Sequence, residues 1–139
     1  MPFVLDGSVT LAWILPDDAS TEADAWRDAL ATDSAIVPGH WALEVANGLL
    51  AAARRRRLVE RDVPGLLRTL SSLPIDTDAG TTAAAWTATL ALARRHRLTL
   101  YDAAYLELAR RLSLPLATID SDLRSACRSA RVRTTVARA

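Results

Sequence analysis

Short apolar runs punctuate the chain, and longer amphipathic stretches separate them. Residues 2–5 and 116–119 are largely apolar and are bounded by turn-forming residues, which is typical of buried strands. Shorter runs at 34–38 and 73–76 predict two further strands. Between the strands, a 3.6-residue period and capping residues predict helices. These helices cover approximately residues 8–15, 21–31, 40–54, 62–73, 82–97, 100–109 and 121–131.

This alternation of strands and helices predicts an α/β sandwich with a mostly parallel central sheet flanked by helices. Thr21 and Asp24 form a capping box for the second helix, and Pro64 falls in the first turn of the helix that begins near Asp62. Residues 132–136 are predicted to close the sheet as an edge strand. Residues 1–139 are expected to form one domain, because no linker, repeat or low-complexity segment interrupts them.

Composition narrows the class of protein without indicating a function. Half of the 139 residues are hydrophobic, enough for a core without disulfides, and the single Cys127 excludes an internal bridge. The 17 basic residues are all arginine and face 16 acidic ones, so the net charge of +1 does not suggest a nucleic-acid partner. We see neither a signal segment nor an apolar run of transmembrane length, and we expect a cytoplasmic protein without membrane association.

Two carboxylates stand directly after predicted strands. Asp6 follows the run at 2–5, and Asp120 follows the run at 116–119, where a helix is predicted to begin. In a parallel sheet, ligands collect outside the carboxyl ends of the strands, where helix N-termini also point. Asp6 and Asp120 are therefore expected at one edge of the sheet.

Two more carboxylates lie on the apolar faces of predicted helices. Glu44 shares a stripe with Trp41 and Val45, and Asp102 shares one with Tyr105, so both acids are expected to face the core. A carboxylate on an apolar face becomes protonated, pairs with a cation or binds a metal, because an isolated buried charge costs several kcal/mol or more. Taken alone, Asp102 and Asp120 are more often explained as helix caps, because both stand near helix starts. Glu44 has no such explanation, and the several acids together favour a metal site.

The absence of lysine bears on the choice of chemistry. Phosphatases and receiver domains that place aspartates at strand ends typically use a lysine to hold phosphoryl oxygens, and the chain has none. The Gly-Lys of a phosphate-binding loop is also missing. Metal-assisted hydrolysis therefore explains the acids better than an aspartyl-phosphate mechanism does.

With these residues in view, the chain resembles the PIN-domain family, and within it the VapC-type toxins of bacterial type II toxin–antitoxin systems. Residues 101–109 and 116–123 match the family's Tyr-Asp-Ala helix and its Thr-x-Asp strand end, and the resemblance covers nearly the whole chain. Residues 4–8 match the opening Asp-x-Ser, with Gly7 where Ala or Thr is usual. Glu44 falls on the helix where the family carries its Glu.

The resemblance implies a PIN-like three-layer sandwich and an endoribonuclease that depends on Mg²⁺ or Mn²⁺. It also implies a cognate VapB-like antitoxin that blocks the site, a homodimer, and a toxin–antitoxin hetero-oligomer. Hard divalent cations prefer carboxylate and water ligands, and such a metal can activate water for attack on an RNA phosphodiester. The resemblance implies that Asp6, Asp102 and Asp120 hold the metal directly, with Asp122 as an auxiliary acid. Glu44 would either bind the metal or orient the attacking water. Ser8 and Thr118 would orient Asp6 and the metal-bound waters.

Other readings of the same residues stay open. The carboxylates could serve a phosphoesterase acting on small substrates, and the chain could instead be a non-catalytic module that binds a partner or nucleic acid. The remaining signals favour structural roles. These are a basic helix end for Arg54 to Arg57, core or interface positions for Trp13, Trp26, Trp41 and Trp86, surface or capping positions for His40 and His96, and a small buried apolar group for Cys127.

Overall fold

The structure, a computed structural model, describes residues 1–137. Its sheet contains four strands in the order β3-β2-β1-β4, and all the paired strands are parallel. Parallel pairing requires a crossover between consecutive strands, and the helices supply it. The strands are β1 (Phe3–Leu5), β2 (Ala35–Val37), β3 (Ile75–Thr77) and β4 (Leu116–Ala117).

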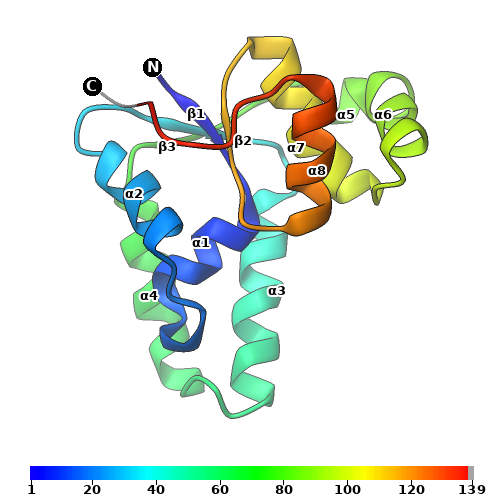
Figure 1. Ribbon diagram of the computed structural model, residues 1–139. Helices are drawn as coiled ribbons and strands as arrows, with labels where there is room; N and C mark the ends of the chain where they lie inside the picture. The colour runs from blue at the N-terminus through cyan, green and yellow to red at the C-terminus, as the bar shows by residue number, and fades with distance from the viewer. Residues whose placement is uncertain (138–139) are drawn as a thin grey trace.

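Eight α-helices accompany the sheet within the described residues, and the α/β class predicted from the pattern is confirmed (Figure 1). The alternation of side chains along β1 sorts them between two apolar clusters. Val4 packs with side chains of α7 and α8, whereas Phe3 and Leu5 pack with those of α1 and α2. The helices are α1 (Gly7–Ile14), α2 (Thr21–Ala29), α3 (Trp41–Arg54), α4 (Val63–Ser71), α5 (Thr81–Ala84), α6 (Ala88–His96), α7 (Leu100–Leu112) and α8 (Ser121–Ala130).

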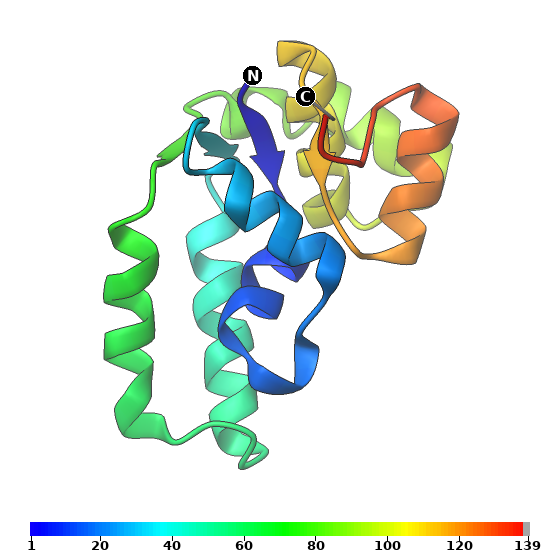
Figure 2. The same cartoon turned by 60° about the vertical axis from the view of Figure 1, so that its left-hand side comes forward.

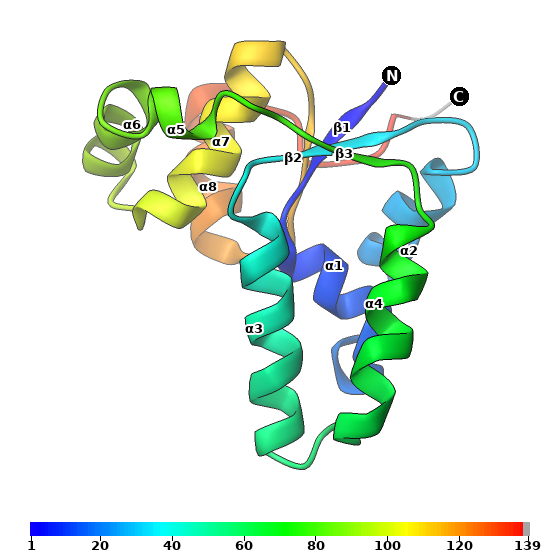
Figure 3. The ribbon, with the colours of Figure 1, turned by 180° about the vertical axis from the view of Figure 1, so that it is seen from behind.

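Helices α3 and α4 extend away from the sheet as an antiparallel hairpin, with α1 beside them (Figures 2 and 3). A third apolar cluster, built on Leu15, Leu49 and Ala52, holds this part together. Helices α5 to α8 lie on the other side of the molecule (Figure 1). The point where β1 ends and α1 and α3 begin therefore lies between the two groups of helices.

The prediction of one continuous helix over 82–97 is wrong. The chain forms α5 and α6 with a turn at 85–87, where Thr87 leaves helical backbone angles at φ −120° and ψ −96°. Its backbone N–H and its hydroxyl both bond the Ala84 carbonyl, at 3.1 and 3.4 Å. A threonine that satisfies the backbone locally competes with helix continuation. Trp86 in this turn is 89% exposed, so it does not belong to the core.

The edge strand predicted over 132–136 is also wrong, since these residues form no strand in the structure. Arg131 ends α8 in the left-handed conformation, with φ 61°. The following segment touches the sheet through a backbone bond from Leu116 N–H to the Arg133 carbonyl, at 2.9 Å. β4 spans only two residues, and so short a strand offers little ladder for a neighbour.

Two further local predictions have clear outcomes. The second helix is capped by Ser20, whose hydroxyl accepts a bond from Ala23 N–H at 3.3 Å, and not by the predicted Thr21. Cys127 is buried as predicted, and burial raises the pKa of its thiol to about 12. Within residues 1–137, no helix combines the length and apolarity needed to cross a bilayer.

Candidate functional site

The carboxylates singled out from the sequence gather at the carboxyl edge of the sheet. Asp6 follows β1 and is the N-cap residue of α1, while Asp120 follows β4 and is the N-cap residue of α8. Glu44 and Asp102 lie in the first turns of α3 and α7. The arrangement follows from parallel pairing, which aligns the ends of β1 and β4, and from helices that begin at that edge.

Asp6 is the most buried of these acids, with 2% of its surface exposed. Its Oδ2 accepts hydrogen bonds from the hydroxyls of Ser8 at 2.6 Å and Thr118 at 2.8 Å. Burial raises the pKa of Asp6 to about 6, because loss of hydration outweighs these two bonds, and the charges of Glu44 and Asp102 raise it further. Among residues 1–137, hydroxyl groups and not basic side chains hold the Asp6 carboxylate, so its charged form is poorly compensated.

The hydroxyls of Ser8 and Thr118 also join the ends of β1 and β4. Thr118 Oγ accepts a bond from Asp120 N–H at 3.1 Å, and Ser8 Oγ accepts one from Ile119 N–H at 3.2 Å. Both hydroxyls thus contact Asp6 and backbone groups on the approach to α8. The contacts to Asp6 that the sequence predicted for these two residues are present.

Trp41 and Thr10 hold the start of α3 against the start of α1. The Trp41 indole N–H donates to the Thr10 hydroxyl at 3.0 Å, and this hydroxyl donates to the Asp6 carbonyl at 3.1 Å. Thr10 is fully buried, so the chain of two bonds is shielded from water. It sets the position of the Glu44 turn relative to Asp6.

Glu44 is held by residues that the sequence analysis did not assign to the site. Tyr105 donates its hydroxyl proton to Glu44 Oε2 at 3.0 Å, and His40 Nε2 lies 3.4 Å from the same oxygen without forming a hydrogen bond. A Cβ added to Gly7 would lie 2.3 Å from Glu44 Oε1. The absence of a side chain at position 7 therefore lets Glu44 reach the backbone at the start of α1.

Asp102 completes the cluster from the opposite side. It is half-buried, and desolvation raises its pKa first, followed by the negative charges of Asp120, Glu44 and Asp122. Its backbone N–H donates to the hydroxyl oxygen of Thr99 at 3.1 Å, so Thr99 and not Asp102 is the N-cap of α7. The capping explanation considered for Asp102 is thus wrong, and its side chain is left for another role.

Asp120 and Asp122 differ in what their carboxylates do. Asp120 Oδ2 accepts the Leu123 N–H bond at 2.8 Å, so Asp120 is a true helix cap. The bond occupies one carboxylate oxygen and leaves Oδ1 for a cation. Asp122 is exposed in the first turn of α8, and its charge is the smallest of the three acidic influences on the pKa of Asp102.

Comparison with known proteins agrees with this geometry. The family model of the PIN domain matches residues 3–129. The chain belongs to the PIN-domain family. This PIN domain is 32% identical over 123 residues to the protein named Ribonuclease VapC3 from Pyrobaculum aerophilum, a match that covers 88% of this chain and 92% of the relative.

Solved structures share the fold of this PIN domain. PAE2754 from Pyrobaculum aerophilum is 24% identical with a TM-score of 0.64, over 91% of this chain and 79% of that one. FitAcB from Neisseria gonorrhoeae is 20% identical with a TM-score of 0.63, over 98% and 97% of the two chains. VapC20 from Mycobacterium tuberculosis, described as a sarcin–ricin loop cleaving toxin, is 16% identical with a TM-score of 0.57, over 89% and 94%.

The chemistry of the donor set in this PIN domain suits a hard divalent cation. All the donors are carboxylates, and Asp6 and Asp102 have raised pKa values, to which the neighbouring negative charges contribute. Within residues 1–137, no three such groups already converge to ligand distance. The Glu44 carboxylate in particular packs against Gly7 and accepts a hydrogen bond from Tyr105. A cation bound here would offset the mutual repulsion of these carboxylates.

A separate ion network shows that not every buried acid of this PIN domain belongs to the cluster. Glu107 is 5% exposed and accepts a bond from Arg111 at 2.7 Å, and the same guanidinium holds Asp78 at 2.7 Å. Arg111 lowers the pKa of Asp78.

Replacing Tyr105 by phenylalanine tests how Glu44 is positioned. Burial raises the pKa of Tyr105, so its hydroxyl remains a neutral donor to Glu44. Loss of that bond is expected to reduce nuclease activity about 10-fold, mainly in kcat, and to cost about 1 kcal/mol of stability. Steady-state kinetics and urea unfolding measure the two effects. Thr89→Val, which removes a buried hydroxyl on α6, serves as the control, and equal loss in both variants would contradict a specific role for Tyr105.

Asparagine variants separate Asp120 from Asp122. Asp120→Asn keeps a good N-cap, so α8 should persist while a charged donor is lost. Cleavage is expected to fall on the order of 10²-fold in Asp120→Asn and only about 3-fold in the exposed Asp122→Asn. Cleavage rates at saturating Mg²⁺, with circular dichroism of both variants, make the comparison. The reverse order would identify Asp122 as the main acid.

Proposed function

We propose that this PIN-domain protein is a VapC-type endoribonuclease toxin that depends on Mg²⁺ or Mn²⁺ and is neutralised by a cognate VapB-like antitoxin. The observation that carries the proposal is the cluster of Asp6, Glu44, Asp102 and Asp120 at the carboxyl edge of the sheet, supplied by four separate elements. The name of the relative that matches 88% of the chain supports the same reaction.

Asp6, Asp102 and Asp120 would hold the cation, with Asp122 as an auxiliary donor. A divalent cation at this position supplies an activated water and stabilises charge on the transferred phosphoryl group. Ser8 and Thr118 fix the Asp6 carboxylate, because both hydroxyls donate to its Oδ2. The other oxygen of Asp6 stays available.

Glu44 has a different part in the proposed reaction. With Oε2 held by Tyr105, its carboxylate orients the attacking water and accepts its proton as the water oxygen joins phosphorus. The bond from phosphorus to the leaving ribose oxygen breaks in line with the attack, and that oxygen takes up a proton from solvent. The products are two RNA ends and no covalent enzyme intermediate.

The test of the proposal is cleavage of a mixed RNA pool by purified, antitoxin-free protein with Mg²⁺, Mn²⁺ or EDTA. We expect discrete products with either metal and none with EDTA. A parallel assay with p-nitrophenyl phosphate addresses the phosphoesterase alternative, which predicts turnover of the small ester and no cutting of RNA. Intact RNA in every condition, from folded protein, would contradict the nuclease proposal.

Assembly is a separate part of the proposal. We expect a homodimer and, with the antitoxin, a hetero-oligomer. Large apolar side chains that remain exposed on the helices, including Leu50 at 40% and Leu112 at 37%, are available for such contacts. Light scattering at micromolar concentration measures the mass, and a monomer at that concentration would contradict the dimer.

A further inference from the structure

A cavity of about 430 Å³ opens beside the carboxylates, between the first turns of α3 and α7. Two of its walls belong to the acidic cluster itself, because Glu44 and Asp102 line it. Its rim is formed by large side chains that face solvent, with Leu43 76% exposed and Tyr101 68% exposed. His40 and Thr99 complete the lining. The cavity and the proposed reaction centre are therefore continuous.

Aromatic rings lead from the reaction centre to the rim of this cavity. The ring of His40 lies 5.0 Å from that of Tyr105, the donor to Glu44, and 5.8 Å from that of Tyr101, measured between centroids. The His40 and Tyr101 rings are tilted by 47°, so they do not stack face to face. One face of Tyr101 thus remains free for another flat group.

We propose that this cavity takes one unpaired nucleobase of the RNA, the base next to the scissile phosphate, stacked on Tyr101 with Leu43 at its edge. The inference rests on the proposed nuclease function and adds a substrate-binding subsite to it. Single-stranded RNA is commonly recognised by stacking of splayed bases on aromatic side chains. A base flanking a scissile phosphate at the reaction centre lies within one nucleotide of the cavity, because Asp102 belongs to both the acidic cluster and the cavity lining.

The negative charge of the cavity lining favours a base over the phosphate groups of the RNA. The carboxylates of Glu44 and Asp102 repel a phosphate from the cavity, as they would repel an acidic peptide. A nucleobase is neutral and flat, and its exocyclic amino groups can donate to these carboxylates. The Thr99 hydroxyl is already engaged, because it accepts the Asp102 backbone N–H and also hydrogen-bonds the Asp102 carboxylate.

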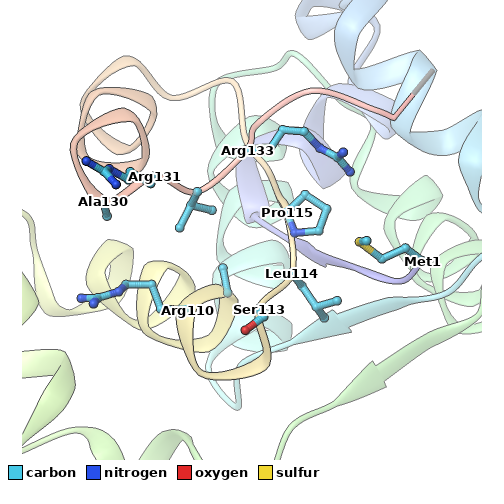
Figure 4. Close-up of a pocket in the computed structure, with 10 residues that line it drawn as sticks. Met1, Arg110, Ser113, Leu114, Pro115, Ala130, Arg131 and Arg133 are labelled. Atoms are coloured by element: carbon cyan, nitrogen blue, oxygen red, sulfur yellow. The ribbon is translucent and has the colours of Figure 1, made fainter.

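Another cavity of similar size is not lined by any residue of the acidic cluster. It measures about 410 Å³ and lies at the opposite edge of the sheet, where Met1 precedes β1 and Pro115 precedes β4. Three arginines line it, but Arg131 and Arg133 extend to opposite sides and do not converge (Figure 4). Arginines at the ends of α7 and α8 are also favoured by the helix dipoles.

The test combines an abasic substrate with a change at Tyr101. Once the wild-type cut site is known, two RNA oligonucleotides are made in which an abasic nucleotide replaces the base on one side or the other of the cut. Wild type, Tyr101→Ala, Tyr101→Phe and Trp86→Ala are assayed on the intact and abasic oligonucleotides. Trp86→Ala removes an exposed aromatic ring outside the cavity and is the matched control.

We expect wild type and Trp86→Ala to lose about 10-fold in kcat/KM when one of the two bases is removed, a loss within the range of one stacking contact. Tyr101→Ala should lose a similar factor on intact RNA and nothing more on the abasic oligonucleotide. Tyr101→Phe should behave like wild type, because it retains the ring. Circular dichroism verifies that the variants are folded.

Other outcomes separate the two proposals. If the abasic nucleotide costs wild type and Tyr101→Ala the same factor, or costs neither anything, the base does not bind at Tyr101 and this inference is overturned. The nuclease proposal would stand, because cutting would still be observed. If wild type cuts no RNA, the proposed function fails and the base subsite fails with it.

Discussion

Asp102→Asn is expected to reduce RNA cleavage on the order of 10³-fold or more with little change in the fold. Its carboxylate caps no helix, since Thr99 provides that cap, and it lies among the charges of Asp120, Glu44 and Asp122. The amide keeps the shape of the side chain and removes its negative charge. The loss should therefore come from cation binding and not from unfolding.

The measurement compares wild type with Asp102→Asn in cleavage rate at saturating Mn²⁺ and in thermal unfolding without metal. Asp28→Asn is the matched control, because it makes the same change on the exposed face of α2. The control should cleave RNA at the wild-type rate. Cleavage retained by Asp102→Asn would remove Asp102 from the mechanism.

Asp6→Asn is expected to abolish cleavage and at the same time to stabilise the metal-free protein at neutral pH. The pKa of Asp6 is about 6 in the folded protein, above the reference value of 3.8, because the group is buried. The folded state therefore binds more protons than the unfolded state between these values. Stability falls as pH rises from about 4 to about 6, and the cost remains above that range.

The difference between 3.8 and about 6 corresponds to about 3 kcal/mol of unfolding free energy. Asparagine stays neutral, and its side-chain oxygen can still accept the bonds from Ser8 and Thr118. Asp6→Asn should thus gain up to about 3 kcal/mol over wild type at pH 7 and only about 0.6 kcal/mol at pH 4. The pH dependence of this difference identifies the titrating carboxylate.

Urea unfolding in EDTA at pH 4, 5, 6 and 7 measures that difference between the two proteins. Added Mn²⁺ should stabilise wild type and leave the variant unchanged, because a ligand of the folded state stabilises it by mass action. A variant that is less stable than wild type at pH 7 without metal would contradict the account of Asp6 as a buried and poorly compensated charge.

Strand ends and helix starts could be predicted from the sequence because local signals determine them. The apolar runs around residues 2–5 and 116–119 led to β1 and β4, and parallel pairing of those strands then brought Asp6 and Asp120 to one edge. The inward stripes of Glu44 and Asp102 followed from the helical period in the same way. Four acids could therefore be named before their separation in space was known.

Contacts between distant residues could not be predicted by the same means. The hydrogen bond from Tyr105 to Glu44 joins two helices 61 positions apart, and the fit of Glu44 against Gly7 depends on how α1 and α3 cross. The helical period placed Tyr105 on the same face of α7 as Asp102, but it did not indicate that Tyr105 hydrogen-bonds Glu44. The departure from the usual residue at position 7 was the one signal that pointed to Gly7.

The predictions of an edge strand at 132–136 and of a continuous helix at 82–97 were wrong for a related reason. Residues 132–136 have the composition of a strand, but a strand needs a partner, and β4 is too short to provide one. Residues 82–97 have the composition of a helix, yet the bonds that Thr87 makes to Ala84 end it early. In the first segment the lack of a strand partner within residues 1–137 overrode local propensity, and in the second a local hydrogen bond did.

The measurement that tests the central claim most directly is a titration of Mn²⁺ into wild type and Asp6→Asn by calorimetry, with RNA cleavage measured at the same Mn²⁺ concentrations. The account predicts that wild type binds Mn²⁺, that cleavage rises in proportion to the occupied fraction, and that the variant, folded and neutral at position 6, shows neither. Cleavage that persists in EDTA, or that Asp6→Asn retains at the wild-type rate, would contradict the claim that these carboxylates form a metal-dependent ribonuclease site.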